Sequence, residues 1–97
     1  MASVLYAQSA KTDLLEAWLS IAEENPGAAD GVVDTVEREA ITLSLQPLMG
    51  RARPELGAGV RSWPSSTPYI LFYLAHDAGI TVLRILHHAR DTQRMAF

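Results

Sequence analysis

The 97-residue sequence predicts one α+β domain covering residues 1–97, in which an N-terminal helical hairpin packs on a small antiparallel sheet of three or four strands. Two observations support this fold. Residues 9–45 repeat apolar side chains at helical spacing on either side of a break at Asn25-Pro26-Gly27. Residues 69–91 hold two apolar, strand-like runs separated by a turn-forming cluster at 76–79. Helices placed before strands can cover only one face of the sheet they pack on.

The N-terminal half is expected to form a strand and two helices. Residues 3–7 are a short apolar run that suits a first strand beside the later hairpin. We expect Ser9 to cap a first helix over residues 9–24, and a second helix to run over residues 28–45. The predicted buried stripes are Leu14, Trp18 and Ile21 on the first helix, and Val33, Val36, Ala40 and Leu43 on the second.

The C-terminal half is expected to form the sheet. Residues 50–59 have the glycines, proline and charges of a surface loop, and residues 60–63 suit a short strand. Pairing Ala75 with Ile80 across the turn then divides the hairpin into two faces. We assign the more apolar face to the core: Ile70, Phe72, Leu74, Thr81, Leu83 and Ile85. The other face is still too apolar for water: Tyr69, Leu71, Tyr73, Val82, Arg84 and Leu86.

That second face is the predicted interaction surface. Contiguous exposed apolar patches usually mark a binding site, so we expect a protein partner to cover it. The remaining alternatives are a second copy of the chain or its own C-terminal segment.

Composition narrows the functional class. The absence of cysteine excludes disulfides and thiolate metal sites, and no apolar run approaches the roughly 20 residues needed to span a bilayer. We therefore expect a cytoplasmic protein without a membrane segment. Charge is distributed unevenly, because residues 1–47 carry two basic and eight acidic side chains, whereas residues 48–97 carry six arginines and three acidic side chains. This pattern suits either pairing between the two halves or an acidic or nucleic-acid partner.

We interpret the polar residues as structural rather than catalytic. His87 and His88 are adjacent, so a strand sends them to opposite faces, and no metal site is predicted. No phosphate-binding loop is present in the sequence, so no cofactor is expected. Asp91 follows Arg90, and we expect it to form a structural ion pair with one of the arginines.

Several short motifs, in order along nearly the whole chain, resemble the ParE/RelE superfamily of bacterial toxins, and its ParE branch most closely. The motifs are Asp13-Leu14, Trp18, Ile21-Ala22, Asn25-Pro26, Gly50-Arg51, Gly59-Val60-Arg61-Ser62, Tyr69 to Tyr73, and Leu83-Arg84-Ile85-Leu86-His87 through Ala89-Arg90-Asp91. The resemblance implies a helical hairpin on a small sheet, in agreement with the fold predicted above.

The resemblance also implies a function. It indicates the toxin of a type II toxin-antitoxin system that inhibits DNA gyrase, is neutralised by a ParD-like antitoxin, meets DNA only through that antitoxin, and is not an enzyme. On this basis the antitoxin is expected on Tyr69, Leu71, Tyr73, Val82, Arg84 and Leu86. The target is expected on the C-terminal residues Arg90, Arg94, Met95 and Phe97.

Two alternatives stay open. RelE-like relatives are ribosome-dependent messenger-RNA endonucleases, and here Arg61, His87 and Arg90 would be the catalytic candidates. This chain departs from the nuclease pattern, because it has no lysine after Lys11 and no tyrosine among its last residues. The other alternative is an inactive module that only binds an antitoxin.

Overall fold

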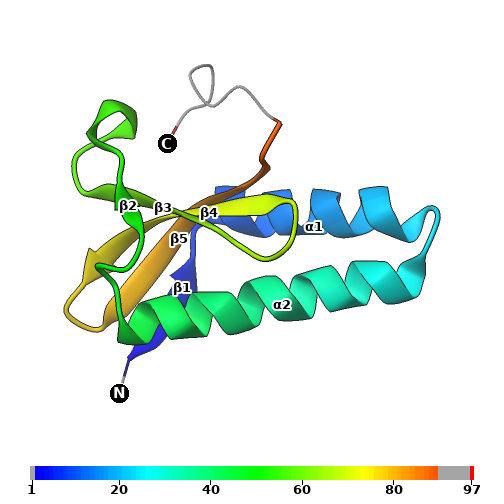
Figure 1. Cartoon of the computed structure of the whole chain (residues 1–97), viewed down its shortest axis with the longest axis horizontal. Coiled ribbons are helices and arrows are strands. Elements are labelled where there is room, and N and C mark those ends of the chain that lie inside the picture. Colours follow the sequence, from blue (N-terminus) through cyan, green and yellow to red (C-terminus); the bar gives the residue numbers. More distant parts are fainter. Residues whose placement is uncertain (1, 90–96) are drawn as a thin grey trace.

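The computed structural model describes residues 2–89 and residue 97. Two antiparallel helices lie side by side and cover one face of a five-stranded sheet (Figure 1). The helices are α1 (Gln8–Ala22) and α2 (Pro26–Leu45). The strands are β1 (Ser3–Tyr6), β2 (Arg51–Ala52), β3 (Val60–Pro64), β4 (Tyr69–His76) and β5 (Gly79–His87), and a short 3₁₀ helix covers Pro54–Leu56.

The predicted fold class is confirmed, with a larger and mixed sheet. The strand order is β1-β5-β4-β3-β2, and β1 runs parallel to β5 while the other pairs are antiparallel. The unpredicted strand is β2, whose two residues lie in the stretch expected to be only a loop. Gly79 is required where β1 meets β5, because its φ is +140° and an added Cβ would lie 1.9 Å from the Ser3 carbonyl oxygen.

The structure confirms the predicted break between the two helices but not the predicted cap of the first helix. Asn25 caps α2, as its side-chain oxygen accepts a hydrogen bond from the Ala28 N–H at 3.0 Å, and Pro26 occupies the first turn. The expected cap at Ser9 is wrong: α1 begins at Gln8, and Ala7 caps it without a side-chain hydrogen bond. Because β1 runs almost directly into α1, the strand sets where the helix begins.

A β-bulge shifts the register of the hairpin within β5. The pairing of Ala75 with Ile80 is confirmed, but Phe72 pairs with Arg84 while Tyr73 pairs with Val82, so Leu83 is an extra residue on β5. Beyond the bulge, Ile85 lies opposite Leu71. Each strand position past this point is therefore shifted by one relative to a regular hairpin.

The expected assignment of the two faces is wrong. Leu71, Tyr73 and Val82 are fully buried in the core beneath the helices, together with Ile80 and Ile85. The alternation of the strand turns Phe72 and Leu74 away from the helices. Both faces are apolar, so hydrophobicity alone could not separate them. The small side chains of Ala10 and Ala40 leave room for large residues such as Tyr73 in the core.

A buried ion pair joins α1 to the bulge. Arg84 donates from Nε to Asp13 Oδ2 at 2.7 Å and from a terminal nitrogen to Asp13 Oδ1 at 2.9 Å. Asp13 Oδ2 also accepts from the Ile85 N–H at 3.0 Å, so one carboxylate holds both a side chain and the backbone of β5. The Asp13 side chain is 7% exposed and the Arg84 side chain 15%. The hydrogen bonds that Arg84 donates to this carboxylate raise the pKa of Arg84 above its ordinary value.

Asp13→Asn is expected to lower the free energy of unfolding by about 3 kcal/mol, since removing one member of a buried pair leaves the other charge uncompensated. Glu23→Gln, on an exposed residue at the end of the same helix, should change it by less than about 0.5 kcal/mol. Denaturant unfolding of both variants checks this. Equal stability of the two variants would show that the pair does not hold α1 to the sheet.

Tyr6 should make the stability of the protein fall at high pH. Burial, with the nearby Glu37 carboxylate, raises the pKa of Tyr6 from 10.0 to about 12. Because the folded state holds the proton more tightly than the unfolded state, this stabilisation is complete below pH 10 and is lost as the pH rises towards 12. We expect Tyr6→Phe to flatten the fall in stability over that interval, as measured by denaturant unfolding at a series of pH values. Part of the fall in stability should remain in Tyr6→Phe, because burial also raises the pKa of Tyr73.

Candidate functional site

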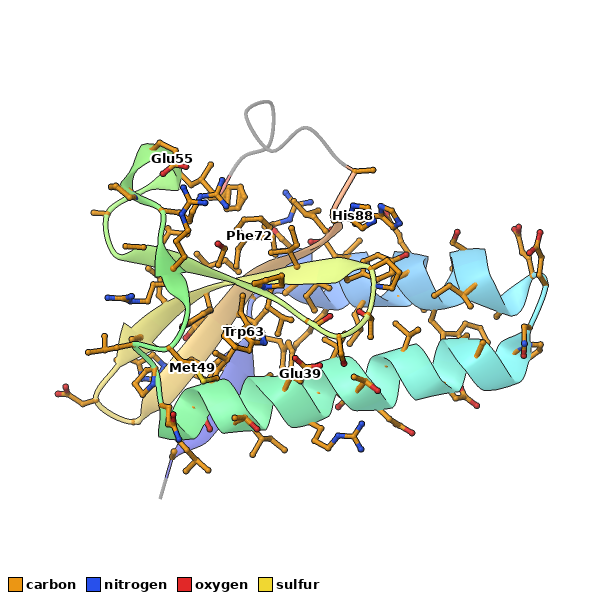
Figure 2. The ribbon with its side chains drawn as sticks, in the orientation of Figure 1. Glu39, Met49, Glu55, Trp63, Phe72 and His88 are labelled. Atoms are coloured by element: carbon orange, nitrogen blue, oxygen red, sulfur yellow. The ribbon has the colours of Figure 1, made fainter. Side chains whose placement is uncertain are left out.

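The face of the sheet that the helices do not cover is the candidate site. We call it the open face; its residues, from the strand pairing, are Val60, Ser62, Ile70, Phe72, Leu74, Thr81 and Leu86. Figure 2 shows Phe72 on one side of the sheet, with Trp63 and Glu39 between the sheet and α2 on the other. The face is mostly apolar, and α1 and α2 lie on the opposite side of the sheet. Four of its residues are nevertheless buried: Val60, Ser62, Phe72 and Leu86.

Arg53 lies against Phe72 and Ser62 of the open face. The Arg53 guanidinium lies 5.8 Å from the centroid of the Phe72 ring, and it donates to Ser62 Oγ at 3.3 Å and to Glu55 Oε2 at 2.8 Å. The hydrogen bond from Arg53 lowers the pKa of the exposed Glu55 carboxyl. Arg53 therefore presents a cation beside an aromatic ring, a combination that suits a partner with carboxylate and apolar groups.

The C-terminal residue packs on this same site. The Phe97 ring meets the Phe72 ring edge to face, with centroids 4.9 Å apart and an angle of 73° between the planes. Phe72 is fully buried as a result of its contacts, whereas Phe97 stays 36% exposed. Phe97, expected to contact the target, thus lies on the sheet of its own chain.

Arg61 binds the backbone of the 48–50 loop. Arg61 donates to the Gly50 carbonyl at 2.7 Å and to the Leu48 carbonyl at 3.4 Å. The Tyr73 hydroxyl fixes the same loop, donating to the Pro47 carbonyl at 2.8 Å and accepting from the Gly50 N–H at 2.9 Å. Gly50 is required here, since an added Cβ would lie 2.4 Å from the Tyr73 hydroxyl. The loop therefore depends on both side chains.

The two adjacent histidines form an aromatic group at the end of β5. His87 meets Tyr69 edge to face at 5.4 Å and stacks on His88 at 4.5 Å. Its Nδ1 accepts a hydrogen bond from the Ala89 N–H at 3.1 Å. Within residues 2–89 and 97, no three His, Asp or Glu side chains gather as a metal site requires.

The nuclease candidates are not brought together. Arg61 pairs with Tyr73 and His87 lies opposite Tyr69, so their backbones are offset by four residues, about 13 Å, along the strands and lie on opposite sides of β4. The third candidate, Arg90, is outside the described residues. An acid-base pair needs its groups within hydrogen-bond reach of one reacting centre, which Arg61 and His87 do not satisfy.

Arg94 and Met95, expected to contact the target, and Asp91, expected to pair with an arginine, lie outside the described residues. Of the six residues predicted to bind the antitoxin, Leu71, Tyr73 and Val82 are buried under the helices and Arg84 is paired with Asp13. Antitoxin contact through these six residues remains a prediction, but its original reason, an uncovered face, no longer holds.

Sequence reasoning missed the residues that mark the open face. It predicted correctly that Phe72 is buried, but on the face that the helices cover, and it treated Arg53 as part of a surface loop. The signal available was the Arg-x-Arg spacing of residues 51–53 before a strand that carries Ser62. Both faces of β4 are apolar, so nothing in the sequence showed that Phe72 lies on the face away from the helices.

Comparison with known proteins identifies the family. A family model described as the ParE toxin of the type II toxin-antitoxin system parDE matches residues 4–92. The chain belongs to the ParE toxin family. It is therefore the toxin of a type II toxin-antitoxin pair, as the sequence resemblance implied.

The solved structures agree on the fold. A chain of the chromosomal ParDE TA system from P. aeruginosa superposes on this ParE protein with a TM-score of 0.74 and 22% identity, covering 90% of this chain and 96% of that chain. No curated protein matches the sequence. In the part of the chain that the structure describes, no helix is long and apolar enough to cross a membrane.

Phe97→Ala is expected to uncover Phe72. Loss of the ring pair should cost about 0.5 to 1.5 kcal/mol of stability and raise the binding of a dye that reports exposed apolar surface. Leu48→Ala is the matched control, because Leu48 is 71% exposed and makes no such ring contact. The contact between Phe97 and Phe72 would be refuted if the two variants bound the dye equally.

Proposed function

We propose that this ParE protein inhibits DNA gyrase in the bacterial cytoplasm and that a ParD-like antitoxin neutralises it. Family membership supports the toxin role, and the side chains favour a binding mechanism over a catalytic one. A gyrase poison requires a surface that binds one state of the enzyme more tightly than the others, and it requires no acid-base pair.

The position of Arg61 is the observation that favours gyrase inhibition over RNA cleavage. A nuclease needs a cation free to stabilise the charge that develops on the phosphate. Here Arg61 donates to two backbone carbonyls of the 48–50 loop, and His87 stacks on His88 some distance along the sheet. Using Arg61 for catalysis would release the loop that it holds. The messenger-RNA endonuclease is therefore the weaker candidate.

We propose the open face as the antitoxin surface, in place of the face expected from the sequence. Arg53 supplies the cation for antitoxin carboxylates, and Phe72 with Ile70 and Leu74 supplies apolar contact. An amphipathic, acidic antitoxin segment fits this combination. Phe97 lies over Phe72, so an antitoxin segment reaching that ring must replace the Phe97 contact.

Purified protein is expected to inhibit supercoiling by gyrase or to accumulate cleaved DNA complexes. Removal of residues 94–97 should abolish the effect, because these residues carry the charged and apolar anchors proposed to meet the target. His87→Ala should leave inhibition within about twofold, since binding needs no general acid or base. A supercoiling assay with each folded variant provides the measurement, and added antitoxin should restore gyrase activity.

The alternative activity, messenger-RNA cleavage, is measured by a separate assay. Cleavage of messenger RNA in a translating extract, lost in His87→Ala, together with unchanged supercoiling, would establish the endonuclease and overturn the gyrase proposal. A folded protein without either effect would establish a module that only binds the antitoxin.

A further inference from the structure

Four large apolar side chains are exposed where α2 ends. They are Ile41, Leu45, Leu48 and Met49, which we call the end patch, and their exposed fractions are 57%, 68%, 71% and 38%. Ile41 and Leu45 are four residues apart, so they share one face of α2. Figure 1 shows why this face is uncovered, since α2 extends past the start of the shorter α1. Figure 2 places Met49 beside the same end of α2.

The loop that carries Leu48 and Met49 is held in one conformation by side chains of the sheet. The Tyr73 hydroxyl and the Arg61 guanidinium together bind four backbone polar groups of residues 47–50. The backbone is therefore fixed while its two large apolar side chains point to solvent. A surface that is ordered before binding loses less conformational entropy when a partner covers it. The loop is thus preorganised for an interface.

The end patch is large enough to form most of the apolar part of one interface. The exposed parts of its four side chains amount to roughly 400 Å², which is in the range of the largest apolar patch on a typical monomer. A standard interface buries about 800 Å² on each partner, of which about 60% is apolar. A second copy of the chain brings an equal patch, so two copies cover the exposed apolar surface of each other.

Charge at the edges of the end patch also favours a second copy. Residues 40–54 contain no acidic side chain, whereas one exposed row of α2 carboxylates precedes the patch: Asp30, Asp34 and Glu37. The exposed Arg51 lies two residues after the patch. Arg38, next to Glu37, donates to Thr35 Oγ1 within its own helix at 3.2 Å. A two-fold axis through the patch therefore sets the acidic edge of one copy against the basic edge of the other.

We propose that the end patch is the interface of a two-fold dimer of this chain. The last turns of α2 from the two copies meet, so that Leu45 and Leu48 of each copy cover those of the other. Glu37 of one copy faces Arg51 of the second copy. The interface uses no residue of the open face, which stays accessible in both copies. This inference does not depend on the gyrase proposal.

Sedimentation equilibrium of the full chain tests the dimer. Between about 1 and 100 μM the chain should show a reversible monomer–dimer equilibrium. Leu45→Ser with Leu48→Ser should weaken dimerisation at least about tenfold, because it removes apolar contact at the centre of the interface. The matched control is Leu15→Ser with Leu19→Ser, which changes two leucines of α1 that are 58% and 51% exposed and should have less than about a twofold effect. Circular dichroism checks that each variant is folded.

Charge reversal tests the two-fold arrangement. Glu37→Arg alone or Arg51→Glu alone places like charges across the interface and should weaken dimerisation at least about threefold. The two changes together recreate an opposite pair, so dimerisation should return to within about twofold of the wild-type value. Glu23→Arg makes the same change in net charge as Glu37→Arg but lies away from the patch, and it should change dimerisation less than about twofold.

Four results would overturn the proposal. A wild-type chain that stays monomeric over the whole concentration range would exclude the dimer. Equal weakening by the two leucine pairs would show that the contact is not confined to the end patch. Failure of the double charge reversal to restore dimerisation would contradict the two-fold arrangement. A monomeric chain that loses antitoxin or target binding in Leu45→Ser with Leu48→Ser would assign the patch to that partner instead.

Discussion

The Asp13 carboxylate is the contact on which the arrangement of the layers depends. It accepts two hydrogen bonds from Arg84 and one from the Ile85 backbone, at the point where β5 carries its extra residue. A bulge leaves a strand with an unpaired position, and the carboxylate of α1 occupies the space beside it. The same contact fixes the height and direction of α1 above the sheet. It therefore joins the helical layer directly to the central part of the sheet.

A second carboxylate joins α2 to the other end of the sheet. Glu39 accepts from Trp63 Nε1 at 2.9 Å, and from the Ser66 N–H at 3.0 Å and the Ser66 hydroxyl at 2.7 Å. Burial opposes ionisation of Glu39, but these hydrogen bonds outweigh it and lower its pKa. Asp13 and Glu39 thus use two of the acidic charges of the N-terminal half to bind the C-terminal half. The remaining carboxylates, including the row on α2, face solvent and give the helical layer its acidic outer surface.

Three arginines of the C-terminal half are held by contacts within the chain. Arg84 pairs with Asp13, Arg61 holds the 48–50 loop, and Arg53 lies against Phe72 on the open face. Two of these three are therefore held by intramolecular contacts away from the open face.

The sequence by itself determined the α+β class, the two helices with their break at Asn25-Pro26, the strand beside the hairpin, the Ala75–Ile80 pairing and the family. Each of these depends on local periodicity, turn chemistry or short motifs, which neighbouring residues specify. Only the tertiary structure decided which hairpin face is buried, because both faces are apolar and one extra residue at Leu83 exchanges them beyond that point. The tertiary structure likewise decided three contacts that the sequence did not predict. Arg84 pairs with Asp13, Phe97 packs on Phe72, and Arg61 binds the 48–50 loop. These contacts join residues far apart in the chain, so no local pattern records them.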